Sequence, residues 1–278
     1  MPSSPPAPGW RENGARSGLP TAQWSSLWQA RDLVRFLALR DVRVRYKQAV
    51  LGVVWVLLQP IATVLIFTLV FDRLANIDSQ GIPYPLFALV GMVVWTYFST
   101  AVSRASAVLV GNPELVTKVA FPRMAAPAAA MLPPLVDVAV SMILVALLLV
   151  YYEVAPSWQV LATPLWLLLL VGAAFGVALW LSALNVRYRD VQNAIGTVLQ
   201  VWLFASPVAY PSTLLSGWRE LVFALNPMAG VIGLTRWSLL GAPWPGWPLA
   251  VSVVVVLVLL ATGILYFRRT ERSFADVI

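Results

Sequence analysis

The chain has 278 residues, of which 60% are hydrophobic and 11% charged, and its mean hydropathy of +0.79 indicates an integral membrane protein. The formal net charge of +7 does not indicate a nucleic-acid partner, because the basic residues flank apolar runs; anionic lipid headgroups explain it better. The absence of Cys and His excludes disulfides, thiol nucleophiles, imidazole bases and the usual zinc and haem ligands.

The Pro-rich start, residues 1–23, lacks the apolar core of a cleavable signal peptide, so we expect a disordered cytoplasmic tail. Residues 24–47 are expected to form an amphipathic helix that lies in the headgroup plane. Its apolar side chains share one arc at 100° per residue: Leu27, Leu33, Val34, Phe36, Leu37 and Val44. The alternative is a basic flank that only fixes topology.

A bilayer core requires roughly 20 mostly apolar residues in a helix. Segments of this character lie at about 51–70, 86–109, 125–150, 161–184, 194–212 and 248–267. The fifth is the weakest, because Pro207 and Pro211 interrupt it and indicate a broken or re-entrant segment. We predict an all-α membrane protein with six transmembrane helices in one domain over residues 48–270, followed by a cytoplasmic tail over 271–278.

The Lys and Arg residues predict the orientation of the chain. Of the 19 basic residues, all but Arg73, Arg219 and Arg236 fall in the N-terminal region, the second and fourth connections, or the C-terminal tail. Because cytoplasmic connections carry the excess of basic residues, we expect both termini on the cytoplasmic side of the membrane.

Two cytoplasmic connections carry charged motifs. In "NPELVTKVAFPR", Asn112 and Pro113 favour a helix start and Glu114 suits its first turn. So short a helix is unstable alone, which predicts a packing partner, although a simple tight connection is the alternative. The fourth connection, "NVRYRDVQNA", is either a topological anchor or a second docking contact; its charged residues are Arg187, Arg189 and Asp190.

Asp137 is the most unusual residue of the third apolar segment. In one continuous helix it would lie roughly 20 Å past Arg123, where a carboxylate faces the bundle interior or water. Pro133 and Pro134 instead allow a shifted segment with Asp137 nearer an interface. In the fourth segment, the small residues Gly172 and Gly176 predict close helix packing.

The connection at about 212–247 is too apolar for a free loop, and Asn226, Pro227, Gly230 and Gly233 interrupt it too often for a further span. We therefore expect two short half-inserted helices on the outer side of the membrane. With the interfacial helix at the N-terminal end, these re-entrant helices complete the expected fold.

The ordered motifs resemble those of ABC-2 type permeases of bacterial polysaccharide export. The resemblance covers roughly residues 30–275, from "RYKQAVLGVVWVLLQP" through "NPELVTKVAFPR", "NVRYRDVQ" and "SPVAYP" to "NPMAGVIGLTR". It implies a homodimeric permease that works with two copies of a separate ABC ATPase. The implied cargo is a polysaccharide of the O-antigen, teichoic acid or capsule type, often linked to a polyprenyl diphosphate lipid.

The resemblance also assigns roles to residues. The basic turn before the first span matches a substrate entry that could attract a diphosphate headgroup, although retention by anionic lipid is equally compatible with it: Arg43, Arg45, Tyr46 and Lys47. Coupling to the ATPase falls on Asn112, Pro113, Glu114 and Lys118, with Arg187, Arg189 and Asp190 as a second contact. The outer gate helices match Asn226, Pro227 and Arg236.

A sliding glycan favours aromatic platforms along a hydrated path, and five aromatic residues could supply them if their helices line the dimer axis: Tyr97, Phe98, Trp202, Phe204 and Tyr210. The chain has no phosphate-binding loop, so ATP and Mg²⁺ are expected in the partner ATPase and no cofactor in this chain. We expect a transporter subunit. The alternatives are an exporter of a drug or small lipid and, much less favoured, a membrane enzyme acting on a polyprenyl-linked glycan.

Overall fold

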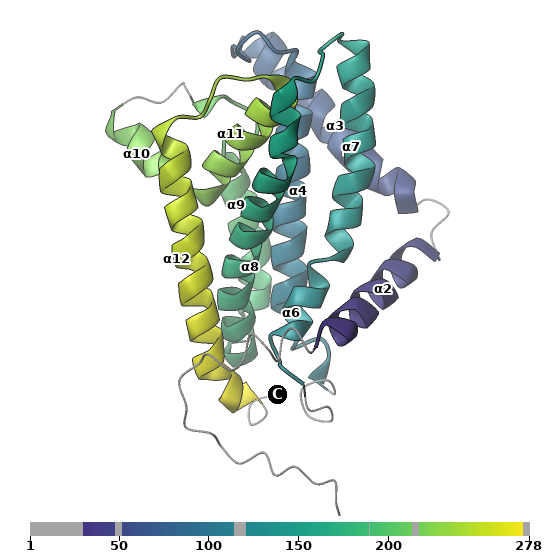
Figure 1. Cartoon of the computed structure of the whole chain (residues 1–278), viewed down its shortest axis with the longest axis vertical. Helices are drawn as coiled ribbons and strands as arrows, with labels where there is room; N and C mark the ends of the chain where they lie inside the picture. The colour runs from purple at the N-terminus through teal and green to yellow at the C-terminus, as the bar shows by residue number, and fades with distance from the viewer. Residues whose placement is uncertain (1–29, 48–51, 114–120, 189, 213–216, 275–278) are drawn as a thin grey trace, which may run out of the picture.

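The computed structural model describes residues 30–47, 52–113, 121–188, 190–212 and 217–274. Helices connected by turns make up these ranges, and no strand occurs among the described residues (Figure 1). The main helices are α2 (Arg31–Lys47), α3 (Gly52–Phe67), α4 (Tyr84–Ala107), α6 (Ala125–Ala130), α7 (Pro133–Tyr151), α8 (Thr163–Arg187), α9 (Val191–Phe204), α10 (Trp218–Ala224), α11 (Pro227–Leu240) and α12 (Trp247–Thr270). Short π- or 3₁₀-helical segments adjoin three of them: η2 (Thr68–Leu74), η3 (Trp158–Ala162) and η5 (Glu271–Ser273).

Among the described residues, five helical stretches are long and apolar enough to cross a membrane. They are Leu57–Leu74, Tyr84–Ala107, Ala125–Tyr151, Trp158–Arg187 and Trp247–Thr270. The remaining predicted span corresponds to α9, which ends at Phe204, before the two prolines that weakened the prediction. Its 14 residues extend only about 21 Å at 1.5 Å per residue, which is less than the roughly 30 Å of a bilayer core.

Helix α4 is the centre of the bundle. It packs against α3, α7, α8, α9 and α11, and 78% of the residues in its most apolar stretch are buried. A helix with partners on all sides is apolar around its whole circumference. Helix α4 indeed buries residues on every side between Leu86 and Phe98. Its position brings the two halves of the sequence together, because α3 and α7 lie on one side and α8, α9 and α11 on the other (Figure 1).

Helix α8 and helix α12 pack closely through glycine, as the spacing of Gly172 and Gly176 predicted. A Cβ atom on Gly176 would lie 2.8 Å from the backbone carbon of Leu259, and one on Gly263 would contact the carbonyl oxygen of Gly176. Because such distances exclude a side chain, the glycines permit the close approach. The prediction of close packing is therefore confirmed.

The third predicted segment is divided in two. Helix α6 ends at Ala130, and α7 begins with Pro133 and Pro134 as its first residues. Proline suits a helix start, because its missing N–H would be unpaired there in any case. The break means that Asp137 lies in the first turns of a new helix rather than deep along a continuous one.

Helix α2 crosses the end of the bundle obliquely and packs on α6 and α7 (Figure 1). Leu37 and Ala38 are buried against these helices, whereas Phe36 and Val44 expose 66% and 63% of their surface. Residues 24–29 of the predicted amphipathic helix lie outside the described residues.

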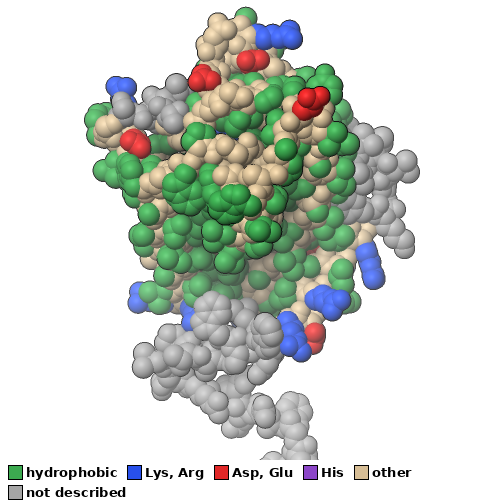
Figure 2. All heavy atoms as spheres, turned by 45° about the horizontal axis from the view of Figure 1, so that its top comes forward, with side chains coloured by type: hydrophobic (Ala, Val, Ile, Leu, Met, Phe, Trp, Pro, Cys, Tyr) green, Lys and Arg blue, Asp and Glu red, His purple; other side chains and the backbone are tan. Residues whose placement is uncertain are grey.

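Charged side chains lie mainly at two opposite ends of the molecule (Figure 2). Arginines gather at the end where α4, α8 and α12 finish, together with those of α2. The opposite end carries side chains of both charges (Figure 2). The charged residues of η2, of the connections before α4 and after α7, and of α10 belong to this end: Asp72, Arg73, Asp78, Glu153, Arg219 and Glu220. The asymmetry that predicted the orientation from sequence is thus present in the folded chain, and we call these the basic end and the outer end.

Candidate functional site

One face of α9 carries exposed polar residues. Asn193, Thr197 and Gln200 are exposed, and Gly196 lies among them with open space where a Cβ atom would be. The spacing i, i+4, i+7 places these residues on one side of the helix. The opposite side packs on α4 and α8 through the buried Ile195 and Leu199. We call Asn193, Gly196, Thr197 and Gln200 the polar stripe.

Such a stripe is unusual on an apolar helix that stands among membrane-spanning helices. Polar side chains at membrane depth face a bundle interior, another subunit or water, since lipid offers them no hydrogen-bond partners. No described element of this chain covers the stripe. The stripe is therefore suited to a hydrated path or to contact with a second chain.

The aromatic residues predicted to line a path have different environments. Tyr97 and Phe98 are 2% and 0% exposed, inside the helix bundle. Phe98 contacts Trp202 edge-on, with ring centroids 5.1 Å apart. Phe204 is 60% exposed at the end of α9, and the hydroxyl of Tyr210 donates to its carbonyl oxygen at 2.8 Å. In this single chain only Phe204 presents its ring largely to the surface, and the lining role of all five residues stays a prediction.

Asn226 connects the end of α9 to the start of α11. Its Nδ2 donates to the carbonyl oxygen of Ala205 at 3.0 Å and to the hydroxyl of Ser206 at 2.9 Å. Its Oδ1 accepts from Nε1 of Trp202 and from the backbone N–H of Met228, which makes Asn226 the N-cap of α11 with Pro227 in the first position. Sequence analysis named Asn226 and Pro227 as interruptions of an apolar connection, and the structure shows that they begin α11 and link it to α9.

Arg236 is the most deeply buried cation among the described residues, with 4% of its surface exposed. Its guanidinium donates to the carbonyl oxygen of Pro207 at 2.7 Å, of Val208 at 2.6 Å and of Phe87 at 3.2 and 3.3 Å. The guanidinium carbon also lies 3.4 Å from the centroid of the Phe87 ring. Carbonyl dipoles and an aromatic face thus replace the hydration of the buried charge.

We call this arrangement the Arg236 clamp, because it ties α11 to α4 and to the turn after α9. Gly91 of α4 makes it possible: a Cβ atom there would lie 2.8 Å from Nη2 of Arg236 and 2.9 Å from the carbonyl oxygen of Val208. Ser252 of α12 adds a second tie, since its hydroxyl accepts from the N–H of Gly230 and donates to the carbonyl oxygen of Ala224. Sequence reasoning named Arg236 but neither Gly91 nor Ser252; a glycine inside an apolar span was the signal available for Gly91.

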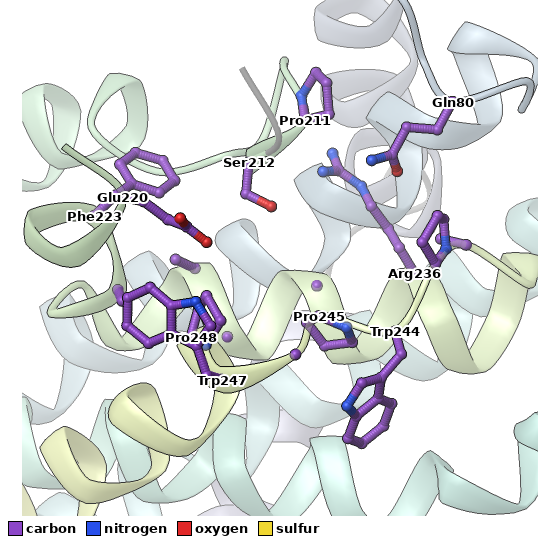
Figure 3. A pocket seen from close by; sticks show the side chains of 17 residues that line it. Gln80, Pro211, Ser212, Glu220, Phe223, Arg236, Trp244, Pro245, Trp247 and Pro248 are labelled. Atoms are coloured by element: carbon purple, nitrogen blue, oxygen red, sulfur yellow. The ribbon is translucent and has the colours of Figure 1, made fainter. Parts of the chain in front are cut away.

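A pocket of about 280 Å³ opens beside the clamp at the outer end (Figure 3). Its walls come from α10, α11, the turn after α9 and the segment that leads into α12. Figure 3 shows aromatic side chains with a carboxylate, an amide and a hydroxyl around it: Phe223, Trp244, Trp247, Glu220, Gln80 and Ser212. Flat apolar faces with hydrogen-bonding groups suit a hydroxylated ligand better than a purely apolar one.

Near the other end of the bundle, Arg45 of α2 forms an ion pair with Asp137 of α7, at 2.8 Å between Nη1 and Oδ2. The two side chains are 31% and 13% exposed. A cavity of about 60 Å³ adjoins the pair, with room for about two water molecules at ~30 Å³ each. Polar side chains of α3, α4 and α7 share it: Gln59, Thr96, Tyr97, Thr100 and Ser141. Asp137 thus has a partner that the sequence did not reveal.

Of the predicted entry residues, Arg43 is exposed on α2 and Arg45 pairs with Asp137. The side chains of Tyr46 and Lys47 lie outside the described residues. The structure therefore places one entry cation on the surface and gives another a carboxylate partner.

The helix ends that border the two charged connections meet at the basic end. Nδ2 of Asn185 donates to the carbonyl oxygen of Ser106 at 3.0 Å and to Oε1 of Gln192 at 2.8 Å, which ties the end of α8 to the end of α4 and the start of α9. Asn112 donates to the carbonyl oxygen of Val108, and a helical residue follows at Pro113.

Arg187 ends α8 with its guanidinium carbon 5.6 Å from the ring centroid of Tyr188, and Asp190 precedes α9. Both residues therefore lie at the turn between α8 and α9, next to the position that Asn185 ties to the end of α4. The other predicted coupling residues, Glu114, Lys118 and Arg189, lie outside the described residues.

Comparison with known proteins gives a consistent result. The family model for the ABC-2 type transporter matches residues 32–240. An O-antigen export system permease protein RfbA of Myxococcus xanthus is 30% identical over 256 residues, which cover 91% of this chain and 97% of that protein. An RfbA of Klebsiella pneumoniae is 22% identical over 248 residues, with 89% and 95% covered. The polysialic acid transport protein KpsM of Escherichia coli is 26% identical over 247 residues, with 86% and 94% covered.

The region that the family model matches includes α4, the polar stripe of α9 and the Arg236 clamp. The longer alignment with the Myxococcus xanthus protein covers nearly all of that relative. The relatives named above are export or transport proteins by name. The chain belongs to the ABC-2 type transporter family.

Proposed function

We propose that this chain is the membrane permease of an ABC exporter that moves a lipid-linked polysaccharide from the cytoplasmic side across the bacterial inner membrane. Two copies form the permease, and two copies of a separate ATPase bind ATP and Mg²⁺ and drive it. Support comes from family membership, from relatives named for export of O-antigen and transport of polysialic acid, and from near-complete coverage of those relatives.

The polar stripe of α9 is the observation that carries the proposal. A glycan chain needs a wet surface with many weak hydrogen-bonding groups, because strong single sites would hold it in place. Asn193, Thr197 and Gln200 offer amides and a hydroxyl, none of them charged. In a homodimer with the two stripes facing one another, these residues line a path that neither copy forms alone, and Phe204 adds an aromatic face at its end.

The six-span arrangement completes the proposal. Helix α9 and the turn after it form the fifth crossing, and the Arg236 clamp holds that turn against α4. Helices α10 and α11 dip into the membrane from the outer side and close the path as gate helices. Both termini and the basic end then face the cytoplasm, where anionic lipids favour the arginines.

The two charged connections form the contact with the ATPase. Asn185 ties the end of α8 to the end of α4 and to the start of α9, so a push on either connection reaches both α4 and α9. This arrangement links the nucleotide-driven motion of the partner to the helix that carries the polar stripe. Coupling requires contacts that differ between the states of the ATPase.

Disruption of the coding sequence in the bacterium that makes this protein tests the proposal. We expect loss of one surface polysaccharide, accumulation of its lipid-linked form inside the cell, and recovery of both when the chain is restored with its ATPase. Unchanged surface glycan with increased sensitivity to an antibiotic would instead favour the drug exporter, the second reading that the family permits.

A further inference from the structure

Two buried hydrogen-bond donors lie in the wall of one cavity near the end of α2. The cavity measures about 60 Å³, and Arg45 of α2 and Tyr97 of α4 both line it. Nη1 of Arg45 and the hydroxyl oxygen of Tyr97 are buried, and neither has a hydrogen-bond partner among the described residues. Because buried polar groups in folded proteins are nearly always paired, each of these donors requires an acceptor. The cavity therefore suits a ligand that brings hydrogen-bond acceptors.

The ion pair at the cavity does not satisfy the guanidinium of Arg45. Its Nη1 lies 2.8 Å from Oδ2 of Asp137, but the two groups lack the alignment of a hydrogen bond, so the attraction is mainly between charges. The side chain of Arg45 is 31% exposed, so a ligand can reach it from the surface. A guanidinium binds carboxylate and phosphate oxygens with the same two-pronged geometry. A phosphate oxygen can therefore replace Asp137 as the partner of Arg45.

The charge of the ligand decides whether this replacement is favourable. Besides the ion pair, the polar residues that line the cavity carry no charge: Gln59, Thr96, Tyr97, Thr100 and Ser141. Their hydroxyls and amide can turn toward an anion and donate to it. Attraction to Arg45 grows with the charge of the ligand, so a diphosphate competes with a carboxylate better than the single phosphate of a bilayer phospholipid does.

We propose that Arg45 and Tyr97 bind the diphosphate of the exported lipid, and that Asp137 competes with this headgroup for Arg45. Without the lipid, the ion pair holds α2 on α7. When the lipid binds, Arg45 pairs with a phosphate oxygen and the hydroxyl of Tyr97 donates to another.

Asp137 thus weakens the binding of the lipid and keeps it reversible, and lipid binding in turn weakens the contact of α2 with α7. A transporter benefits from this competition, because a headgroup held too tightly at the entry would not move on. The inference rests on the proposed function, since it takes the exported lipid as the source of the diphosphate.

Equilibrium binding of radiolabelled farnesyl diphosphate tests the site, with the full-length permease and its ATPase in phosphatidylcholine nanodiscs. Arg45→Gln should weaken binding. Asp137→Asn should bind the probe about tenfold more tightly than the unmodified protein, because Arg45 loses its competing partner; this factor corresponds to ~1.4 kcal/mol. In the Arg45→Gln background, the change of Asp137 to Asn should alter the affinity by less than about twofold.

Asp41→Asn is the matched control for the loss of a negative charge. Asp41 pairs with Arg40 at 3.0 Å on the same helix and does not line the cavity. Its replacement should therefore change the affinity for farnesyl diphosphate by less than about twofold.

A second variant tests the other donor. Tyr97→Phe keeps the ring and removes only the hydroxyl, so it should weaken binding of farnesyl diphosphate about tenfold, the effect of one hydrogen bond to a charged group. Because this hydroxyl has no hydrogen-bond partner among the described residues, its removal should leave the stability of the chain unchanged. A loss of affinity in Tyr97→Phe then reports on the ligand rather than on the fold.

Unchanged or weaker binding in an assembled Asp137→Asn complex would overturn the proposal, as would equal tightening by Asp137→Asn and Asp41→Asn, or full affinity in Tyr97→Phe. Displacement of farnesyl diphosphate by equimolar dioctanoyl phosphatidylglycerol would also overturn it, in favour of a membrane phospholipid as occupant. None of these results would contradict the proposed function, because surface glycan after disruption of the coding sequence tests that function separately.

Discussion

The two arginines Arg236 and Arg45 show two ways of placing a cation inside a membrane protein. Arg236 is held by three backbone carbonyl groups and the Phe87 ring, without a carboxylate among the described residues. Arg45 instead pairs with Asp137 beside a small polar cavity. The first arrangement fixes backbone segments and suits a rigid support, whereas the second joins two side chains and can open when either finds another partner.

The comparison predicts the largest loss of stability for Arg236→Met. This change removes the charged donor from the buried carbonyl groups of Pro207 and Val208, and each unsatisfied group costs about 1–3 kcal/mol, so we expect a loss of at least ~2 kcal/mol. Thermal unfolding in a lipid-containing detergent measures it. Arg219→Met, an exposed arginine at the same end, is the control and should change stability little. Equal behaviour of the two variants would show that the clamp is not structural.

Gly91→Ala in α4 should disturb the same Arg236 clamp. The new Cβ atom would meet Nη2 of Arg236 at 2.8 Å and the carbonyl oxygen of Val208 at 2.9 Å, and overpacking of this kind costs about 1–3 kcal/mol. Gly196→Ala is the matched control, because it also lies inside a helix and meets nothing within 4 Å. The control gains helix propensity of up to ~1 kcal/mol. We expect opposite signs for the two variants in the same unfolding assay.

The Arg45–Asp137 pair should have a smaller effect that depends on both partners. Arg45→Gln and Asp137→Asn should each lower stability, and the double variant should lose less than the sum of the two. We expect a coupling energy of about 1–2 kcal/mol, within the range for residues in direct contact. A double-mutant cycle from unfolding midpoints measures it. Additive losses would mean that the ion pair holds α2 on α7 only weakly.

Phe204→Ala should have the smallest effect on stability and a larger one on transport. The ring is 60% exposed, so its loss should change stability by under about 0.5 kcal/mol. If it lines the path in the dimer, glycan export should slow while the ATPase of the complex still turns over. Export at the normal rate would remove Phe204 from the path.

Hydropathy predicted much of the fold. Five of the six apolar runs appear as membrane-length helical stretches. Pro207 and Pro211 correctly weakened the prediction of the fifth run, because proline removes a backbone donor. The break between α6 and α7 was expected in part, because Pro133 and Pro134 allowed a shifted segment with Asp137 nearer an interface. The sequence did not reveal that Arg45 is the partner of Asp137. Local patterns report on local backbone, so they located helices better than contacts.

The candidate site depended more on tertiary structure. Arg236 contacts Phe87, which precedes it by 149 positions, and no local pattern encodes such a pairing. Tyr97 and Phe98 were predicted as path residues from their type, yet the central position of α4 buries both in a single chain. The polar stripe was present in the sequence as Asn193, Thr197 and Gln200, but its meaning required knowledge of which face of α9 is packed.

Cysteine labelling along α9 tests the central claim, that the polar stripe faces water in the assembled permease. Because the chain has no cysteine, each introduced thiol is the only one present. In membranes that contain the permease and its ATPase, a water-soluble thiol reagent should modify Thr197→Cys and Gln200→Cys at least tenfold faster than Leu199→Cys on the packed face. It should also modify them faster than Leu257→Cys of α12, an apolar position that is 59% exposed and that we expect to face lipid. Equal rates at positions 197, 200 and 257 would contradict the account.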